Sequence, residues 1–130
     1  MDWKDCCLTV IDRIEELEEA DDFKRPVTKE DLGEFWDEYK ATITYPVDLT
    51  SVRAKIYEGE YAGVGNFEFD MRKLFDNCKK FNDPNSGIYE NAIVLEDLFQ
   101  KLFRPVKKTF GENKKLKDAG IKISIGGIGI

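Results

Sequence analysis

The chain has 130 residues, of which 42% are hydrophobic and 35% charged, a composition that fits one globular domain and excludes a disordered chain or two separate cores. Its net charge of −6 argues against a duplex nucleic-acid binder, whose affinity rests on cations that neutralise phosphates, and favours basic partners. With no histidine and three cysteines, the sequence excludes Ser-His-Asp and Cys-His catalysis, zinc sites that need histidine and four-thiolate zinc sites.

The cysteines and the N-terminus indicate a cellular compartment. Cys6, Cys7 and Cys78 form no spaced disulfide framework, which predicts free thiols in a reducing environment. The N-terminal segment lacks the basic and apolar regions of a signal peptide, and no run approaches the roughly 20 apolar residues of a membrane span. We therefore expect a soluble, intracellular protein.

The first predicted element is an amphipathic helix from Cys7 to near Ala20, where apolar residues recur at three- and four-residue steps. Residues 21–48 then hold two prolines, five aromatic residues and no sustained period, so we expect an ordered, functional loop with a short helical turn. This loop carries eight acidic and four basic side chains, a balance of −4, which predicts a negative surface.

Three further helices follow the loop. Asp48 is the predicted N-cap of a short helix that contains Leu49, Val52 and Ile56 and stops at Glu58-Gly59. The next helix places Phe67, Met71, Leu74, Phe75 and Cys78 on one face and should turn Asp70, Arg72, Lys73, Asp76 and Lys79 outward. The last helix starts near Ser86 and should lose regularity around Arg104-Pro105.

The predicted domain covers residues 1–110, and residues 111–130 are a predicted tail that is first basic and then rich in isoleucine and glycine. Cys78 occupies a core position of its helix, so we expect a buried, inert thiol rather than a nucleophile. The turn from Asp83 is similar to the start of a calcium loop, but Val94 stands where such a loop needs glutamate, so no metal site is predicted.

Two segments carry a family resemblance. The stretch "YPVDLTSVRAKIYEGEY" and the stretch "MRKLFDNCKKFNDPNSGIY", in this order and spacing, resemble the bromodomain family of acetyl-lysine readers, over about Leu8 to Phe110. The resemblance implies an all-α, left-handed antiparallel four-helix bundle with a long loop between the first and second helices. It also implies a pocket at one end of the bundle, formed by that loop and the loop at Asn82.

The resemblance implies a role for each pocket residue. Asn82 would anchor the acetyl carbonyl, Tyr39 would hold an ordered water, Phe23 would form the floor, Val27 the wall and Ile88 the entrance, with Phe81 and Trp36 as further lining residues. Asn82 can equally be a helix C-cap in the left-handed conformation, and the two roles are compatible. Core or loop packing is the alternative role of the apolar residues and Tyr39, and a helix staple is the alternative role of Ile88.

The chain also departs from the family pattern. Phe81 stands where the family often has tyrosine, and Asp21-Asp22 stand where a Trp-Pro pair is common, which predicts a more open and more acidic groove. The resemblance implies a non-enzymatic, cofactor-free nuclear module that binds an acetylated histone tail or another acetylated lysine-rich protein. Two alternatives stay open: a docking scaffold of the same fold without acetyl-lysine binding, and the reader module of a larger chromatin enzyme such as an acetyltransferase.

Overall fold

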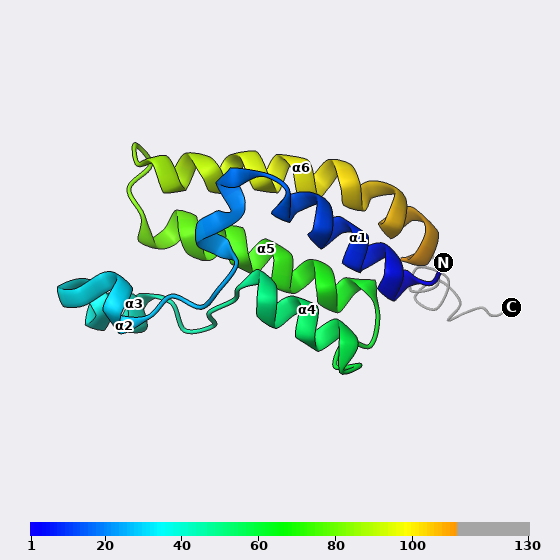
Figure 1. Ribbon diagram of the computed structural model, residues 1–130, viewed down its shortest axis with the longest axis horizontal. Coiled ribbons are helices and arrows are strands. Elements are labelled where there is room, and N and C mark those ends of the chain that lie inside the picture. The colour runs from blue at the N-terminus through cyan, green and yellow to red at the C-terminus, as the bar shows by residue number, and fades with distance from the viewer. Residues whose placement is uncertain (112–130) are drawn as a thin grey trace, which may run out of the picture.

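The computed structural model describes residues 1–111, and its long helices pack side by side as an antiparallel bundle (Figure 1). These helices are α1 (Trp3–Glu15), α4 (Leu49–Tyr57), α5 (Val64–Phe81) and α6 (Gly87–Phe110). Helix α6 packs against both α5 and α1, while α4 packs against α1 and α5. Residues 1–111 contain no strand, so the predicted all-α four-helix bundle is confirmed.

Aromatic rings fill the core between α5 and α6. The ring of Phe99 stacks on that of Phe103 at a centroid distance of 5.1 Å, and both rings meet Phe67, at 6.1 and 5.8 Å. The four-residue spacing of Phe99 and Phe103 puts both rings on one face of α6, and burying each of the three side chains contributes about 1.5–3 kcal/mol. This contact holds the ends of α5 and α6 in a fixed relation.

Helix α1 differs from the prediction at both ends. It begins at Trp3 rather than Cys7, because the Asp2 side chain accepts a hydrogen bond from the backbone N–H of Asp5 at 2.9 Å. It ends at Glu15, and the chain becomes extended at Leu17 before the 3-10 helix η1 (Glu18–Phe23). That change of direction buries Ala20 and Phe23, which a continuous helix to Ala20 would place differently.

The segment predicted as a loop is more helical than expected. It contains α2 (Lys29–Leu32), the 3-10 turn η2 (Gly33–Phe35) and α3 (Trp36–Thr42), which together project from one end of the bundle (Figure 1). A capping box starts α2, in which Asp31 N–H donates to Thr28 Oγ1 at 3.2 Å and Thr28 N–H donates to Asp31 Oδ2 at 3.0 Å. The α5–α6 loop lies at the same end of the bundle (Figure 1).

The predicted starts of α4 at Asp48 and of α6 near Ser86 are correct, and in each a side chain caps the helix. The Asp48 carboxylate accepts a hydrogen bond from the Ser51 N–H at 3.0 Å, and Ser86 Oγ accepts one from the Tyr89 N–H at 3.3 Å. The expected break at Arg104-Pro105 is wrong, because α6 continues to Phe110. Pro105 is exposed, so the carbonyl that loses its helical donor can face water, while buried Phe103 and Val106 keep the helix on the core.

The predicted tail lies, from residue 112 onward, outside the described residues, so the domain boundary after Phe110 stays a prediction. No helix within residues 1–111 combines the length and the apolar character needed to cross a membrane.

Candidate functional site

Asn82 closes the C-terminal end of α5. Its backbone N–H donates to the Cys78 carbonyl at 3.0 Å, so it is a C-cap, as the alternative interpretation had it. Its φ of −98° and ψ of 152° are extended, however, so the expected left-handed conformation is wrong. The side-chain Nδ2 also donates to the Cys78 carbonyl at 3.0 Å, which fixes the amide group at the mouth of the loop.

The turn after Asn82 is built from its own hydrogen bonds. Asp83 Oδ1 accepts from the Asn85 N–H at 2.8 Å, and the Ser86 hydroxyl donates to the Asp83 carbonyl at 2.7 Å. Since Ser86 also caps α6, a short turn with several internal hydrogen bonds joins the two helices. Asn82 therefore sits on a rigid joint rather than on a mobile loop.

Three predicted site residues meet beside this joint. The Tyr39 ring meets the Phe81 ring edge to face, with centroids 5.1 Å apart and planes at 85°, and Trp36 stacks on Tyr39 at 5.9 Å. All three rings are half-buried, and the Lys40 ammonium lies 5.6 Å from the centre of the Trp36 ring. The contact between Tyr39 and Phe81 packs α3 against the C-terminal end of α5, where Phe81 directly precedes Asn82.

Burial raises the pKa of Tyr39, and the nearby Cys78 and Asp48 raise it further. The phenol therefore stays protonated at neutral pH, with a hydroxyl that can donate to water or to a ligand.

The structure places the other predicted lining residues in different surroundings. Phe23 is 5% exposed and belongs to the hydrophobic core, as the packing alternative had it. Ile88 is half-buried in the first turn of α6 and packs against the same core. Val27 is half-buried and belongs neither to that core cluster nor to the aromatic group of Trp36, Tyr39 and Phe81. Their roles toward a ligand stay predictions.

Cys78 lies one helical turn before Asn82 in α5 and is 9% exposed. Its thiol donates to the Ile88 carbonyl at 3.4 Å, and its Sγ lies 3.6 Å from Asn82 Nδ2. Burial raises the pKa of Cys78 to about 11, against the smaller opposing effect of the Asn82 amide. The predicted burial of Cys78 is confirmed, and the raised pKa supports the predicted inertness, because only the thiolate is a good nucleophile.

Thiol reactivity should follow this burial. Burial raises the pKa of Cys7 to about 12, and Cys7 and Cys78 are both buried, whereas Cys6 is partly exposed. At pH 8 we expect iodoacetamide to label Cys6 in the folded protein and to label Cys7 and Cys78 only after unfolding, as read by mass spectrometry. Equal labelling of all three cysteines in the folded protein would contradict this assignment.

The same shifts set an alkaline limit on stability. The folded pKa values of about 12 for Cys7 and about 11 for Cys78 lie above the ordinary value of 9.0, so folding favours the protonated thiols. Their contribution is complete below pH 9 and is lost as the pH rises through 11 and then 12, by up to about 1.4 kcal/mol per pH unit and thiol. Urea unfolding at pH 8, 9.5 and 11 measures the decline.

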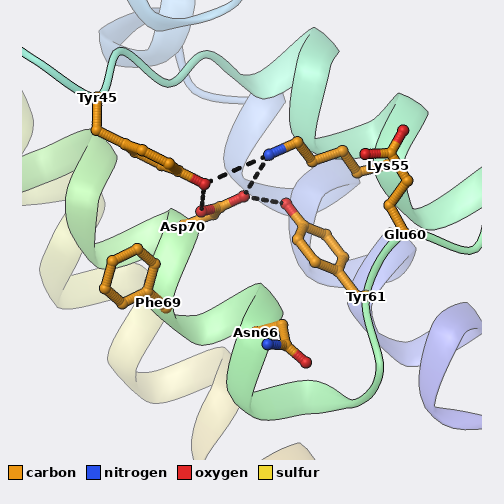
Figure 2. Close-up of a pocket in the computed structure, with 7 residues that line it drawn as sticks. All are labelled: Tyr45, Lys55, Glu60, Tyr61, Asn66, Phe69 and Asp70. Carbon is orange, nitrogen blue, oxygen red and sulfur yellow. Dashed lines mark hydrogen bonds and ion pairs between the residues drawn. The ribbon is translucent and has the colours of Figure 1, made fainter.

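A second polar cluster lies between α4 and α5, away from Asn82. Side chains that Figure 2 draws as sticks line a hollow of about 210 Å³ there, and none of them is a predicted site residue: Tyr45, Lys55, Glu60, Tyr61, Asn66, Phe69 and Asp70. Asp70 accepts hydrogen bonds from the Tyr61 hydroxyl at 2.6 Å, the Tyr45 hydroxyl at 2.9 Å and the Lys55 ammonium at 3.2 Å. We call these four residues the Asp70 network.

Asp70 is 2% exposed, so the prediction that it faces outward is wrong. Three donors satisfy its carboxylate, which makes its burial tolerable. The signal was present in the sequence, because position 70 is three residues after Phe67 and four before Leu74 and therefore lies within the apolar stripe.

The Asp70 network anchors the end of the loop rather than offering a reactive group. Burial lowers the pKa of Lys55, but its hydrogen bond and charge interaction with Asp70 raise it to a net value above the ordinary one. Burial and the bond to Asp70 raise the pKa of Tyr61. Asn77 Nδ2 adds a hydrogen bond to the Tyr45 carbonyl at 2.8 Å, so α5 holds Tyr45 from both its ring and its backbone.

Within the described part of the chain, no group of three or more histidine, cysteine, aspartate or glutamate residues is arranged to hold a metal ion.

Comparison with known proteins gives a family match. The Bromodomain family model matches residues 7–93. The chain is 32% identical over 80% of its length to Protein cbp-1 of Caenorhabditis elegans, and 32% identical over 57% to Histone acetyltransferase GCN5 of Debaryomyces hansenii. It is 30% identical over 78% to Bromodomain adjacent to zinc finger domain protein 2B of Gallus gallus. The matches span 5%, 15% and 5% of the lengths of these three relatives, in that order.

Proposed function

This chain belongs to the bromodomain family, and we propose that it binds acetylated lysine in histone-like tails through a pocket anchored by Asn82. Bromodomains are reader modules, so the domain itself performs no catalysis. The observation that carries the proposal is the Asn82 amide, held by the Cys78 carbonyl beside the Tyr39 and Phe81 rings.

The Asn82 side-chain amide suits an uncharged ligand group. One N–H of Asn82 Nδ2 donates to the Cys78 carbonyl, which leaves the second N–H for an acetyl carbonyl. A buried carbonyl without a partner costs about 1–3 kcal/mol, so this bond selects for a group that can accept it. An unmodified lysine would have to lose the hydration of its ammonium, at a cost of several kcal/mol, on the order of a thousandfold in affinity.

The neighbouring rings complete the proposed pocket. The neutral Tyr39 hydroxyl can hold a water that bridges to the acetyl carbonyl, and such water-mediated bonds are nearly as favourable as direct ones. Phe81 and Trp36 support Tyr39 through ring contacts, while Phe23, Val27 and Ile88 exclude bulk water around the methyl group and the stem.

Charge favours a lysine-rich partner. The segment that carries α2 and α3 lies at the same end of the bundle as the α5–α6 loop (Figure 1), and it exposes Glu30, Asp31, Glu34, Asp37 and Glu38. A negative rim speeds the encounter with a basic histone tail, to a degree that falls with ionic strength. We accordingly propose a nuclear location and a place within a larger chromatin protein, which the names of the relatives support.

Two alternatives follow from specific observations. Asp21 and Asp22 are exposed where a Trp-Pro pair is common in the family, which favours a docking scaffold without acetyl-lysine binding. The match to a histone acetyltransferase favours the reader module of a larger enzyme.

Calorimetric titration with two histone-tail peptides, identical except for acetylation of one lysine, tests the proposal. We expect the acetylated peptide to bind at least about tenfold more tightly, because the unmodified ammonium must be desolvated. Raising the salt concentration should weaken the binding of both peptides, while the preference for the acetylated peptide stays. Equal affinity for the two peptides would support the docking scaffold instead.

A further inference from the structure

We infer that Cys78 is a positioning residue, whose thiol fixes the orientation of the Asn82 amide and ties it to the first turn of α6. This inference rests on the proposed function, because it assigns to Cys78 the task of presenting the Asn82 amide to the acetyl group. It does not give Cys78 a contact with the ligand.

The geometry is a relay of hydrogen bonds across the α5–α6 joint. Asn82 Nδ2 lies 3.6 Å from Cys78 Sγ and 3.0 Å from the Cys78 carbonyl, so one residue holds the amide with two acceptors. The thiol hydrogen is directed at the Ile88 carbonyl, at 3.4 Å. The bridge therefore links the proposed anchor to the backbone of the residue proposed for the pocket entrance.

The hydrogen bonds of the relay favour one orientation of the Asn82 amide. A thiol carries a single hydrogen, and while the Ile88 carbonyl takes it, the sulfur can only accept from its other neighbour. If the amide of Asn82 turned over, its Oδ1 would face both the sulfur and the Cys78 carbonyl, and three acceptors would meet without a hydrogen. The nitrogen is thus held toward Cys78, where the carbonyl and the sulfur share one N–H in this inference, which leaves the second N–H for the acetyl carbonyl.

Sulfur suits this place for two reasons. Its contacts of 3.4 and 3.6 Å reach both partners, whereas a hydroxyl group prefers about 2.7–2.8 Å to an oxygen acceptor. Burial also raises the pKa of Cys78 to about 11, so the thiol keeps its hydrogen across the physiological range. Serine should therefore replace the relay only in part.

Three variants test the inference. Cys78→Ala removes donor and acceptor, Cys78→Ser keeps both at shorter reach, and Cys7→Ala is the matched control, a buried cysteine of α1 in the same core. The first readout is the affinity for the acetylated histone peptide. The second is the pair of Asn82 side-chain NH₂ signals in the NMR spectrum of the protein without peptide, which a merely structural role of Cys78 would leave unchanged.

We expect Cys78→Ala to bind the acetylated peptide about three- to tenfold more weakly, as the loss of one hydrogen bond predicts, and Cys78→Ser to recover part of the loss. Cys7→Ala should bind like the wild type, even where its melting temperature falls. The Asn82 NH₂ signals should move and exchange faster with water in Cys78→Ala and stay in place in Cys7→Ala.

Unchanged NH₂ signals and unchanged affinity in Cys78→Ala would overturn the inference. The two readouts also separate it from the proposed function. If the wild type ignored acetylation while the NH₂ signals still responded to Cys78→Ala alone, the orientation by Cys78 would stand and the acetyl-lysine proposal would fail.

Discussion

Replacing Asp70 with alanine should lower the free energy of unfolding by about 3 kcal/mol, because a buried carboxylate with several donors disappears from the Asp70 network. The change leaves the buried Tyr61 hydroxyl without its acceptor at 2.6 Å and the Lys55 ammonium without its ion pair at 3.2 Å. Lys55 is partly exposed and can regain water, so most of the cost arises at Tyr61 and at the void. Urea unfolding followed by far-UV circular dichroism measures the change.

Asp76→Ala is the matched control. Asp76 lies in the same helix, but it is exposed and its ion pair with Lys79 is long, at 4.0 Å, so its loss should change the free energy of unfolding by less than about 0.5 kcal/mol. Asp70→Asn, which keeps the shape and one acceptor, should fall between the two. Equal stability of Asp70→Ala and Asp76→Ala would show that the Asp70 network contributes little.

Replacing Asn82 with alanine should weaken binding of the acetylated peptide by about 30-fold or more and abolish the preference for acetylation. The loss follows from a buried acetyl carbonyl that no longer has its donor, together with the loss of the fixed geometry of the amide. Asn82→Asp should be as damaging, because it exchanges the donor for a charged acceptor of the same shape. Calorimetric titration against acetylated and unacetylated peptides measures both affinities.

Asn85→Ala controls for this prediction, since Asn85 is exposed in the same turn and its backbone N–H, not its side chain, donates to Asp83 Oδ1. It should bind the acetylated peptide within about twofold of the wild type, as expected for a surface change that removes no side-chain partner. An acetyl preference that survived in Asn82→Ala would remove Asn82 from the site and end the present proposal.

Local sequence signals predicted much of the fold. The predicted cap at Asp48 depends only on its side chain and the next turn of backbone, and α4 starts there, while α6 starts next to Ser86, as expected. The apolar stripe of Phe67, Met71 and Leu74 predicted the buried face of α5, because that periodicity is set by helix geometry alone. The order of two motifs predicted the family, which the match over residues 7–93 confirms.

The predictions that were wrong concern features that depend on contacts between distant segments of the chain. Helical periodicity places position 70 in the apolar stripe, but it does not identify Tyr45 and Lys55, 25 and 15 residues away in sequence, whose hydrogen bonds make the burial of Asp70 tolerable. The continuation of α6 past Pro105 depends on how Phe103 and Val106 pack against the rest of the core.

At the candidate site, the sequence predicted residue types better than conformations. Asn82 is a cap as one interpretation held, yet its extended backbone is set by the hydrogen-bonded turn that follows it. The meeting of Tyr39 with Phe81 required α3, a helix that the sequence showed only as part of a loop. The contribution of Cys78 was hidden because its partners, Asn82 and Ile88, come together only when the joint is folded.

A crystal structure with an acetylated histone-tail peptide would test the central claim most directly. The proposal predicts the acetyl oxygen within about 3 Å of Asn82 Nδ2, the usual length of such a bond, with the methyl group toward Phe23. An acetyl group bound elsewhere, for instance in the hollow beside Asp70, or an Asn82 side chain turned away from the ligand, would contradict it.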